Sequence, residues 1–253
     1  MSTSHSAVVS KPGLVRARNE DSAYVGHWLC AVADGMGGHA AGDVASATVV
    51  NAIRRFDVAT EVARLTTVLG SAVRAANSQL ATRAEGAQAL AGMGSTLTAM
   101  LWSDSHVAVA HIGDSRAYLL RNRMLRQITE DHILSNLVAA PMPARIGGYL
   151  VRYLDARPGW SPDLTLRAVL PGDRYLICSD GLSGFAGPDA IRAVLADSGD
   201  ADQAADSLVS LAYASGAPDN VTVIVTDVPG GTRGERAGGP LVVGAAAELA
   251  SSA

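Results

Sequence analysis

The chain has few aromatic residues and no apolar run long enough to cross a membrane. Aromatic side chains make up 4% of its 253 residues, so a core must be built mostly from alanine, valine and leucine. Apolar residues reach 48%, which supports one large domain or two small ones. A bilayer span needs roughly 20 consecutive apolar residues, and the absence of such a run argues against a membrane protein.

Lysine and cysteine are also scarce. Lys11 is the single lysine, the arginines form no run, and the net charge is -4, so a nucleic-acid binder is not expected. The two cysteines, Cys30 and Cys178, each lie within an apolar run and are expected to be buried free thiols in a reducing compartment. Residues 1–11 lack the layout of a signal peptide, so we expect a cytoplasmic protein.

One stretch combines a buried strand with a metal-binding side chain. The apolar run from Leu29 ends at Asp34, and Gly35, Gly37 and Gly38 follow it. Glycines allow the backbone to approach a ligand closely, and a carboxylate at a strand tip is a common element of metal and phosphate sites.

Hydrophobic periodicity and turn residues predict further elements along the chain. Helices are predicted over 43–56, 60–85, 188–196 and 201–213, and a strand over 24–33 ends at Asp34. Four short strands over 95–128 have the spacing of an antiparallel meander, and later strands are predicted over 164–169, 174–179 and 221–228. The irregular segment 131–162 is long enough to suggest a function, and 229–253 is predicted to be a disordered tail.

Four aspartates stand beside glycine or in turns: Asp34, Asp114, Asp180 and Asp219. Each alone is an ordinary turn residue. Two of them, however, terminate apolar strands, where a carboxylate is costly unless a cation compensates it. Carboxylates and carbonyls are the ligands that Mg²⁺ and Mn²⁺ prefer, and no His/Cys cluster with zinc spacing competes.

Six motifs in order over residues 5 to 228 resemble those of the bacterial PP2C-type, metal-dependent protein phosphatases (PPM family). They are Gly13–Arg16 with Asn19–Ser22, Ala33–His39, Gly92–Thr96, His111–Arg116, Cys178–Leu182 and Asp219–Val223. The resemblance implies an α+β fold in one domain over 1–228: a four-layer α-β-β-α sandwich of two antiparallel β-sheets flanked by helices. It also implies hydrolysis of phosphoserine and phosphothreonine in proteins by a metal-bridged hydroxide.

The resemblance further assigns roles to individual residues. Asp34 would bridge two Mn²⁺ or Mg²⁺ ions, which Asp180, Asp219 and the Gly35 carbonyl complete. Glu20 and Asp21 would act through water, Asp114 would hold a third, weaker ion, and Arg16 would clamp the substrate phosphate. The partners implied are Ser/Thr-phosphorylated proteins and, as a candidate, a protein kinase; we expect a monomer that binds neither nucleic acid nor a membrane.

The sequence departs from the family pattern in two places. Some members carry a histidine two residues after the bridging aspartate, where this chain has Met36, so His39 or a metal-bound water is left as the candidate general acid. Residues 131–155 correspond to the flap beside the active site, but the segment looks shortened and is rich in Pro, Ala and Gly.

Two other functions are weighed against this interpretation. Gly113–Arg116 is similar to the Gly-Asp-Ser block of serine esterases, with Ser115 as the nucleophile, but no histidine follows His132 to complete a triad. A phosphoprotein-binding module without turnover is the second alternative. The retained carboxylates argue against it.

Overall fold

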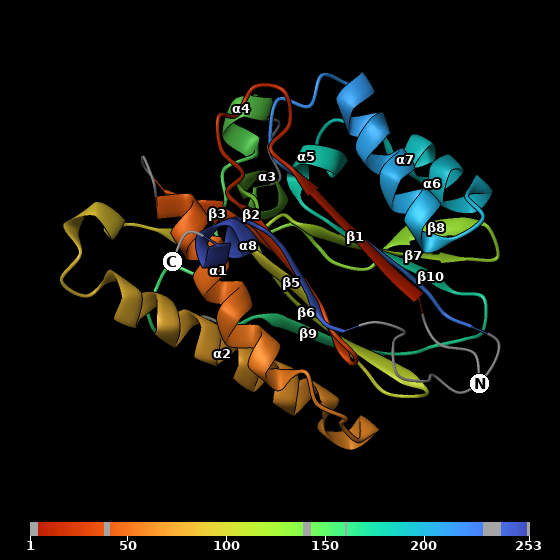
Figure 1. Ribbon diagram of the computed structural model, residues 1–253, viewed down its shortest axis with the longest axis horizontal. Coiled ribbons are helices and arrows are strands. Elements are labelled where there is room, and N and C mark those ends of the chain that lie inside the picture. The colour runs from red at the N-terminus through yellow and green to blue at the C-terminus, as the bar shows by residue number, and fades with distance from the viewer. Residues whose placement is uncertain (1–4, 38–40, 139–142, 160, 230–238, 252–253) are drawn as a thin grey trace.

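The computed structural model describes residues 5–37, 41–138, 143–159, 161–229 and 239–251. Two antiparallel sheets lie face to face, and helices cover their outer faces, as Figure 1 shows. The expected α-β-β-α sandwich is therefore confirmed.

Both sheets combine strands that are distant in the sequence. The first has the order β1 (His5–Lys11), β11 (Val221–Asp227), β10 (Arg174–Cys178), β7 (Arg116–Arg121) and β8 (Met124–Gln127). The second has the order β12 (Leu241–Gly244), β2 (Asp21–Val25), β3 (Leu29–Met36), β5 (Leu97–Trp102), β6 (His106–Ile112) and β9 (Asp163–Ala168), with β4 (Gly94–Ser95) beside β3.

Long helices form the two outer layers. α1 (Ala41–Ile53) and α2 (Leu65–Ala84) pack on the second sheet, and α6 (Pro188–Asp197) and α7 (Ala201–Ala214) pack on the first. The short helices are α3 (Leu134–Leu137), α4 (Ala144–Gly147), α5 (Asp180–Ser183) and α8 (Ala245–Ser251), with 3-10 turns η1 (Arg54–Phe56), η2 (Val62–Arg64) and η3 (Gln88–Leu90). The described helices include none with the length and hydropathy of a membrane-spanning segment.

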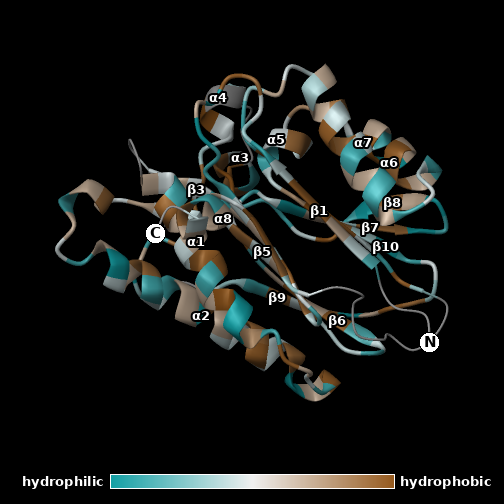
Figure 2. Cartoon of the chain, viewed as in Figure 1, coloured by the Kyte–Doolittle hydropathy of each residue, from teal (hydrophilic) through white to brown (hydrophobic). Residues whose placement is uncertain are grey.

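Alternation along the strands divides the core into three layers. In β5, Leu97 and Leu101 belong to the cluster under α1 and α2, whereas Met100 and Trp102 face the other sheet. Trp102 meets Tyr175 of β10 edge to face, with ring centroids 4.9 Å apart. In Figure 2 apolar residues follow the central strands, whereas α2 alternates apolar and polar residues, because one face of that helix meets solvent.

The single strand predicted over 24–33 is wrong, because the chain turns between β2 and β3. The Asp57 carboxylate accepts hydrogen bonds from the backbone N–H groups of His27, Trp28 and Leu29 and from the Tyr24 hydroxyl. Its partners lie about thirty residues away in the sequence, so no local sequence pattern predicts the turn.

The meander predicted over 95–128 is wrong at its centre. β5 pairs with β6 and β7 pairs with β8, but β6 and β7 belong to different sheets. The chain crosses between the sheets at Gly113, whose φ is 117°, and a Cβ there would lie 2.5 Å from the Cβ of Thr96. The crossing carries Asp114 to the end of both sheets.

The disordered tail predicted over 229–253 is contradicted for residues 241–251. Leu241–Gly244 forms β12 against β2, and α8 follows with Ala245 and Ala246 buried. The Ala246 N–H donates to the Ser22 hydroxyl at 3.0 Å. The apolar segment covers an open sheet edge, which composition alone does not reveal.

Candidate metal centre

An acidic cavity of about 490 Å³ lies at one end of the sandwich. Asp34 reaches it from β3, Asp180 from the start of α5 after β10, and Asp219 from the loop before β11. Asp114 arrives from the sheet crossing and Glu20 from the loop before β2. The structure therefore gathers five of the predicted carboxylates around one space.

The sixth carboxylate, Asp21, lies behind the cavity. The β2–β3 register sets it opposite Asp34, and its side chain is fully buried. Ser179 Oγ donates to Asp21 Oδ2 at 2.7 Å, whereas Oδ1 has no hydrogen-bond partner among the described residues. Burial, with repulsion from Asp180 and Asp219, raises the pKa of Asp21 to about 7. An orphaned buried carboxylate oxygen indicates a missing positive partner.

The other buried carboxylates also have raised pKa values. Burial is the main cause that raises the pKa of Asp114 to about 7 and of Asp180 to about 6. Burial, followed by the charge of Asp21, raises the pKa of Asp34 well above its usual value. Because each ionised group makes the next harder to ionise, the cavity favours protons or cations.

One cation lies among the described residues that line the cavity. Arg16 Nη2 donates to Asp219 Oδ2 at 2.7 Å, and this hydrogen bond is the main cause that raises the pKa of Arg16. The pair is open to solvent, with side-chain exposures of 50% and 30%. Burial also raises the pKa of Glu20, although Arg16 acts in the opposite direction. A single arginine leaves the cavity with an excess of negative groups.

Gly35 allows the backbone to close around the cavity. A Cβ at this position would lie 1.9 Å from the carbonyl oxygen of Gly42 and 2.7 Å from that of Glu20. The Gly35 N–H donates to the Glu20 carbonyl at 3.2 Å. Any side chain here would separate the two loops, so the glycine predicted as a backbone ligand is also required sterically.

The sequence interpretation missed Asn220, which supports the site through its side chain. Its Oδ1 accepts the Glu20 N–H at 2.8 Å, and its amide donates to the carbonyls of Pro12 and Arg18 at 3.0 and 2.8 Å. These contacts hold the loop that carries Arg16 and Glu20. The sequence signal for this residue is its place directly after Asp219.

The donor chemistry fits a hard divalent ion. The cavity lining that the structure describes contains carboxylates, hydroxyls and backbone groups but neither histidine nor cysteine. No three acidic, histidine or cysteine side chains in the described ranges converge tightly enough to enclose one ion by themselves. Mg²⁺ typically keeps several waters and takes only one or two carboxylates, so an open arrangement suits it.

Four other residues from the sequence interpretation remain. His39 lies outside the described residues. Ser115 is fully buried and its hydroxyl bonds the Thr96 hydroxyl at 2.8 Å, so the structure lends no support to a serine esterase. Cys30 and Cys178 are both buried thiols outside any disulfide, as predicted, and burial raises the pKa of Cys178 to about 12.

Comparison with known proteins agrees with the site. The sequence model described as Protein phosphatase 2C matches residues 17–211, and this chain belongs to that family. It is 44% identical over 229 residues to the serine/threonine protein phosphatase PstP of Mycobacterium tuberculosis, a match covering 88% of this chain and 44% of PstP. This chain therefore spans less than half of that relative.

Two further relatives cover most of both chains. The serine/threonine phosphatase stp of Listeria monocytogenes is 32% identical over 242 residues, covering 88% of this chain and 95% of stp. The crystal structure of the PstP catalytic domain in complex with two manganese ions superposes with a TM-score of 0.83 at 43% identity, covering 89% and 98% of the two chains.

Proposed function

We propose that this protein hydrolyses phosphoserine and phosphothreonine esters in proteins with the help of two Mn²⁺ or Mg²⁺ ions. The observation that carries the proposal is the cavity in which five carboxylates face one arginine. A metal-dependent phosphatase needs such a surplus of negative charge to hold its ions. Membership of the phosphatase 2C family and the manganese-bound relative support the same chemistry.

The residues of the site would bind the ions either directly or through water. Asp34 would be shared between two ions, with Asp180 and Asp219 on the first and the Gly35 carbonyl on the second. Glu20 and Asp21 would act through water, and Asp114 would hold a third, weaker ion. When bound, the ions would act as Lewis acids and lower the pKa of water toward ~7.

Arg16 would bind the phosphate of the substrate. Its guanidinium lies at the cavity with half of its side chain exposed, so a ligand can reach it. Guanidinium is planar and always charged, which suits two parallel hydrogen bonds to phosphate oxygens. In exchange Arg16 would release Asp219, which is then free to bind an ion.

The test is hydrolysis of p-nitrophenyl phosphate and of a phosphothreonine peptide with Mn²⁺. Metal catalysis supplies several kcal/mol, so Asp34→Asn, Asp180→Ala and Asp219→Ala should each lower kcat/KM by about 1,000-fold or more. EDTA should abolish turnover, and excess Mn²⁺ should restore it. Wild-type turnover no greater than that of Asp34→Asn would instead favour the phosphoprotein-binding module, and activity that survives chelation would reject the metals.

The cellular setting belongs to the same proposal. Two buried cysteines that form no disulfide are typical of a reducing compartment and support a cytoplasmic location. We further propose that the protein acts as a monomer on phosphoproteins produced by a protein kinase. Sedimentation of the purified chain tests the monomer, since a dimer would double the mass.

A further inference from the structure

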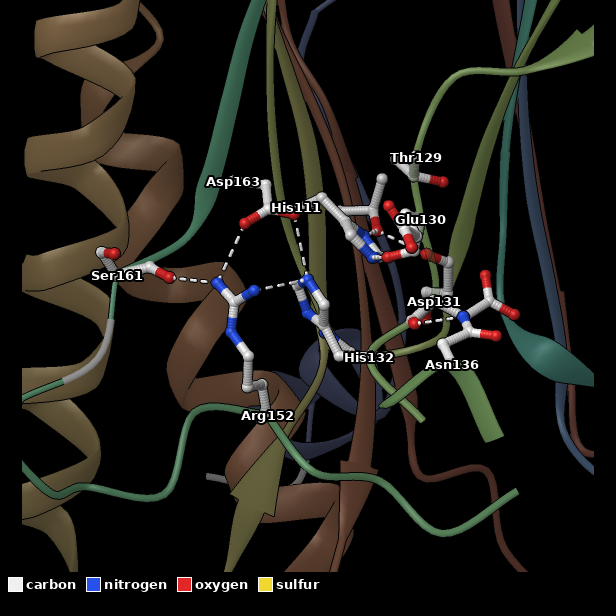
Figure 3. A network of polar contacts seen from close by, with 12 residues as sticks. His111, Thr129, Glu130, Asp131, His132, Asn136, Arg152, Ser161 and Asp163 are labelled. Atoms are coloured by element: carbon white, nitrogen blue, oxygen red, sulfur yellow. Dashed lines mark hydrogen bonds and ion pairs between the residues drawn. The ribbon is translucent and has the colours of Figure 1, made fainter. Parts of the chain in front are cut away.

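A network of polar contacts connects the flap segment to the sheet crossing that carries Asp114. Figure 3 shows its centre: the side chains of His132, Arg152 and Asp163 meet one another in a triangle, and the His111 ring lies beside that of His132. His132 follows β8, Arg152 lies in the segment that returns from α4, and Asp163 begins β9. Residues from three parts of the chain therefore meet at one imidazole.

His132 grips the peptide of Gly113 at two points. The His132 N–H donates to the Gly113 carbonyl at 2.8 Å, and the Gly113 N–H donates to His132 Nδ1 at 3.0 Å. His132 is 7% exposed, and the His111 ring lies against it with centroids 4.8 Å apart. The carbonyl of His132 accepts the Val151 N–H at 2.9 Å, which attaches the flap return.

These contacts determine which nitrogen carries the proton. Because Nδ1 accepts the Gly113 N–H, the ring hydrogen must be on Nε2, and Nε2 donates to Asp163 Oδ2 at 3.1 Å. The Arg152 guanidinium only donates, and it donates to Asp163 Oδ1 at 3.0 Å and to the Ser161 carbonyl at 2.5 Å. Its Nη1 also lies 2.9 Å from His132 Nε2, a contact that is not a hydrogen bond when Nε2 carries the proton. Burial lowers the pKa of His132, which favours this neutral ring.

Gly113 needs to be held, because its conformation is unusual and its neighbour is functional. Its φ of 117° lies in the region that favours glycine, and Thr96 packs against its other side. Among the contacts of the Asp114 carboxylate is a hydrogen bond from the backbone of its own residue. The backbone at Gly113 therefore decides where that carboxylate lies.

We propose that His132 is a positioning residue that clamps the Gly113 peptide so that Asp114 faces the cavity, with Asp163 and Arg152 holding the imidazole in the required tautomer. The inference rests on the proposed function, since Asp114 is the residue assigned to the third ion. It also links two segments: the chain that returns from α4 and the turn before Asp114 both bond to His132. A displacement of one segment would therefore strain the contacts of the other.

Two substitutions separate the halves of the clamp. The Oδ1 of His132→Asn can take the place of Nδ1 and still accept the Gly113 N–H. The longer amide of His132→Gln reaches the place of Nε2 and donates to Asp163, but it leaves the Gly113 N–H without an acceptor. A purely structural role for a buried polar side chain would not distinguish these variants in this order.

The measurement is Mn²⁺ binding by isothermal titration calorimetry, with circular dichroism to confirm the fold. Partners that orient a metal ligand typically change affinity 10- to 100-fold. We expect His132→Gln to weaken only the weakest Mn²⁺ site, by about 10-fold, and His132→Asn to stay within about twofold of wild type. Asp114→Asn provides the reference for complete loss of that site.

The outcomes distinguish the two proposals. Equal affinities in both variants, or a uniform loss at every ion site, would overturn the positioning role and leave the phosphatase proposal standing. A wild type that binds no Mn²⁺ would reject both.

Discussion

The two ends of strands β10 and β11 carry the same acidic residue type in opposite circumstances. At one end Asp173 and Asp227 each meet an arginine: Arg121 donates two hydrogen bonds of 2.6 Å to Asp173, and Arg174 donates bonds of 2.5 and 2.9 Å to Asp227. At the other end Asp180 and Asp219 join three further carboxylates around a cavity with one arginine.

The two ends differ in whether the chain neutralises its own carboxylates. It does so at the end where each one meets an arginine, and it does not at the cavity. Where each carboxylate has its own guanidinium, the charges stabilise the sandwich and need nothing more. Where carboxylates crowd one another, their raised pKa values show that the folded protein holds them at a cost. Such unbalanced charge is typical of a functional site.

The largest expected effect is that removing one carboxylate lowers the free energy of unfolding at the paired end and raises it at the acidic end. Asp173→Asn removes one partner of a nearly buried ion pair and should lower the free energy of unfolding by about 2–3 kcal/mol, somewhat less than a fully buried pair because Arg121 is partly exposed. Asp34→Asn should instead raise the stability of the metal-free protein, because it removes repulsion. Urea unfolding in EDTA measures both.

The control for that comparison is the exposed pair Arg123–Asp197, in which both side chains are 68% exposed. Asp197→Asn should change stability by less than about 1 kcal/mol. If Asp34→Asn destabilises the metal-free protein as Asp173→Asn does, the two ends do not differ in the way described.

A smaller effect is expected when Arg16, the arginine among the described residues that line the cavity, is removed. Arg16→Ala should raise KM by about 10-fold and lower kcat less, because the guanidinium holds phosphate in the ground state as well as in the transition state. Steady-state kinetics with a phosphothreonine peptide provide the measurement. Arg18→Ala is the control, since Arg18 is 65% exposed and lies 3.6 Å from Asp43. A fall in kcat at constant KM would assign Arg16 to the transition state instead.

The sequence predicts the acidic end better than the rest of the fold. Asp34, Asp180 and Asp219 are recognisable because each interrupts an apolar pattern beside a glycine or a turn. The resemblance of six motifs then predicts the sandwich, which the structure confirms.

The features that the sequence did not predict depend on distant partners. Asp57 turns the chain between β2 and β3, Asn220 holds the loop of Arg16, and β12 finds the edge of β2, all across long sequence separations. The clamp of His132 on Gly113 belongs to the same group, because its ring is placed by residues from β9 and from the flap. Such contacts cannot be predicted from local sequence patterns.

The last expected effect is a pH-dependent difference between wild type and Asp114→Asn without metal. Burial raises the pKa of Asp114 to about 7, so the folded protein binds this proton more tightly than the unfolded chain does. Stability attributable to Asp114 is therefore lowest above pH 7 and increases as the pH falls from 7 toward ~4. The variant should melt a few degrees above wild type at pH 8, with each kcal/mol shifting the melting temperature by about 2–4 °C.

That advantage should shrink at pH 5, where Asp114 is protonated in the folded wild type. Calorimetry in EDTA at both pH values measures it, and the difference between variants cancels groups common to both, including His111, whose pKa burial lowers to about 4. A constant difference between pH 5 and pH 8 would mean that Asp114 does not hold a raised pKa in the folded protein. The acidic end would then be less crowded than its geometry indicates, and the contrast with the paired end of β10 would weaken accordingly.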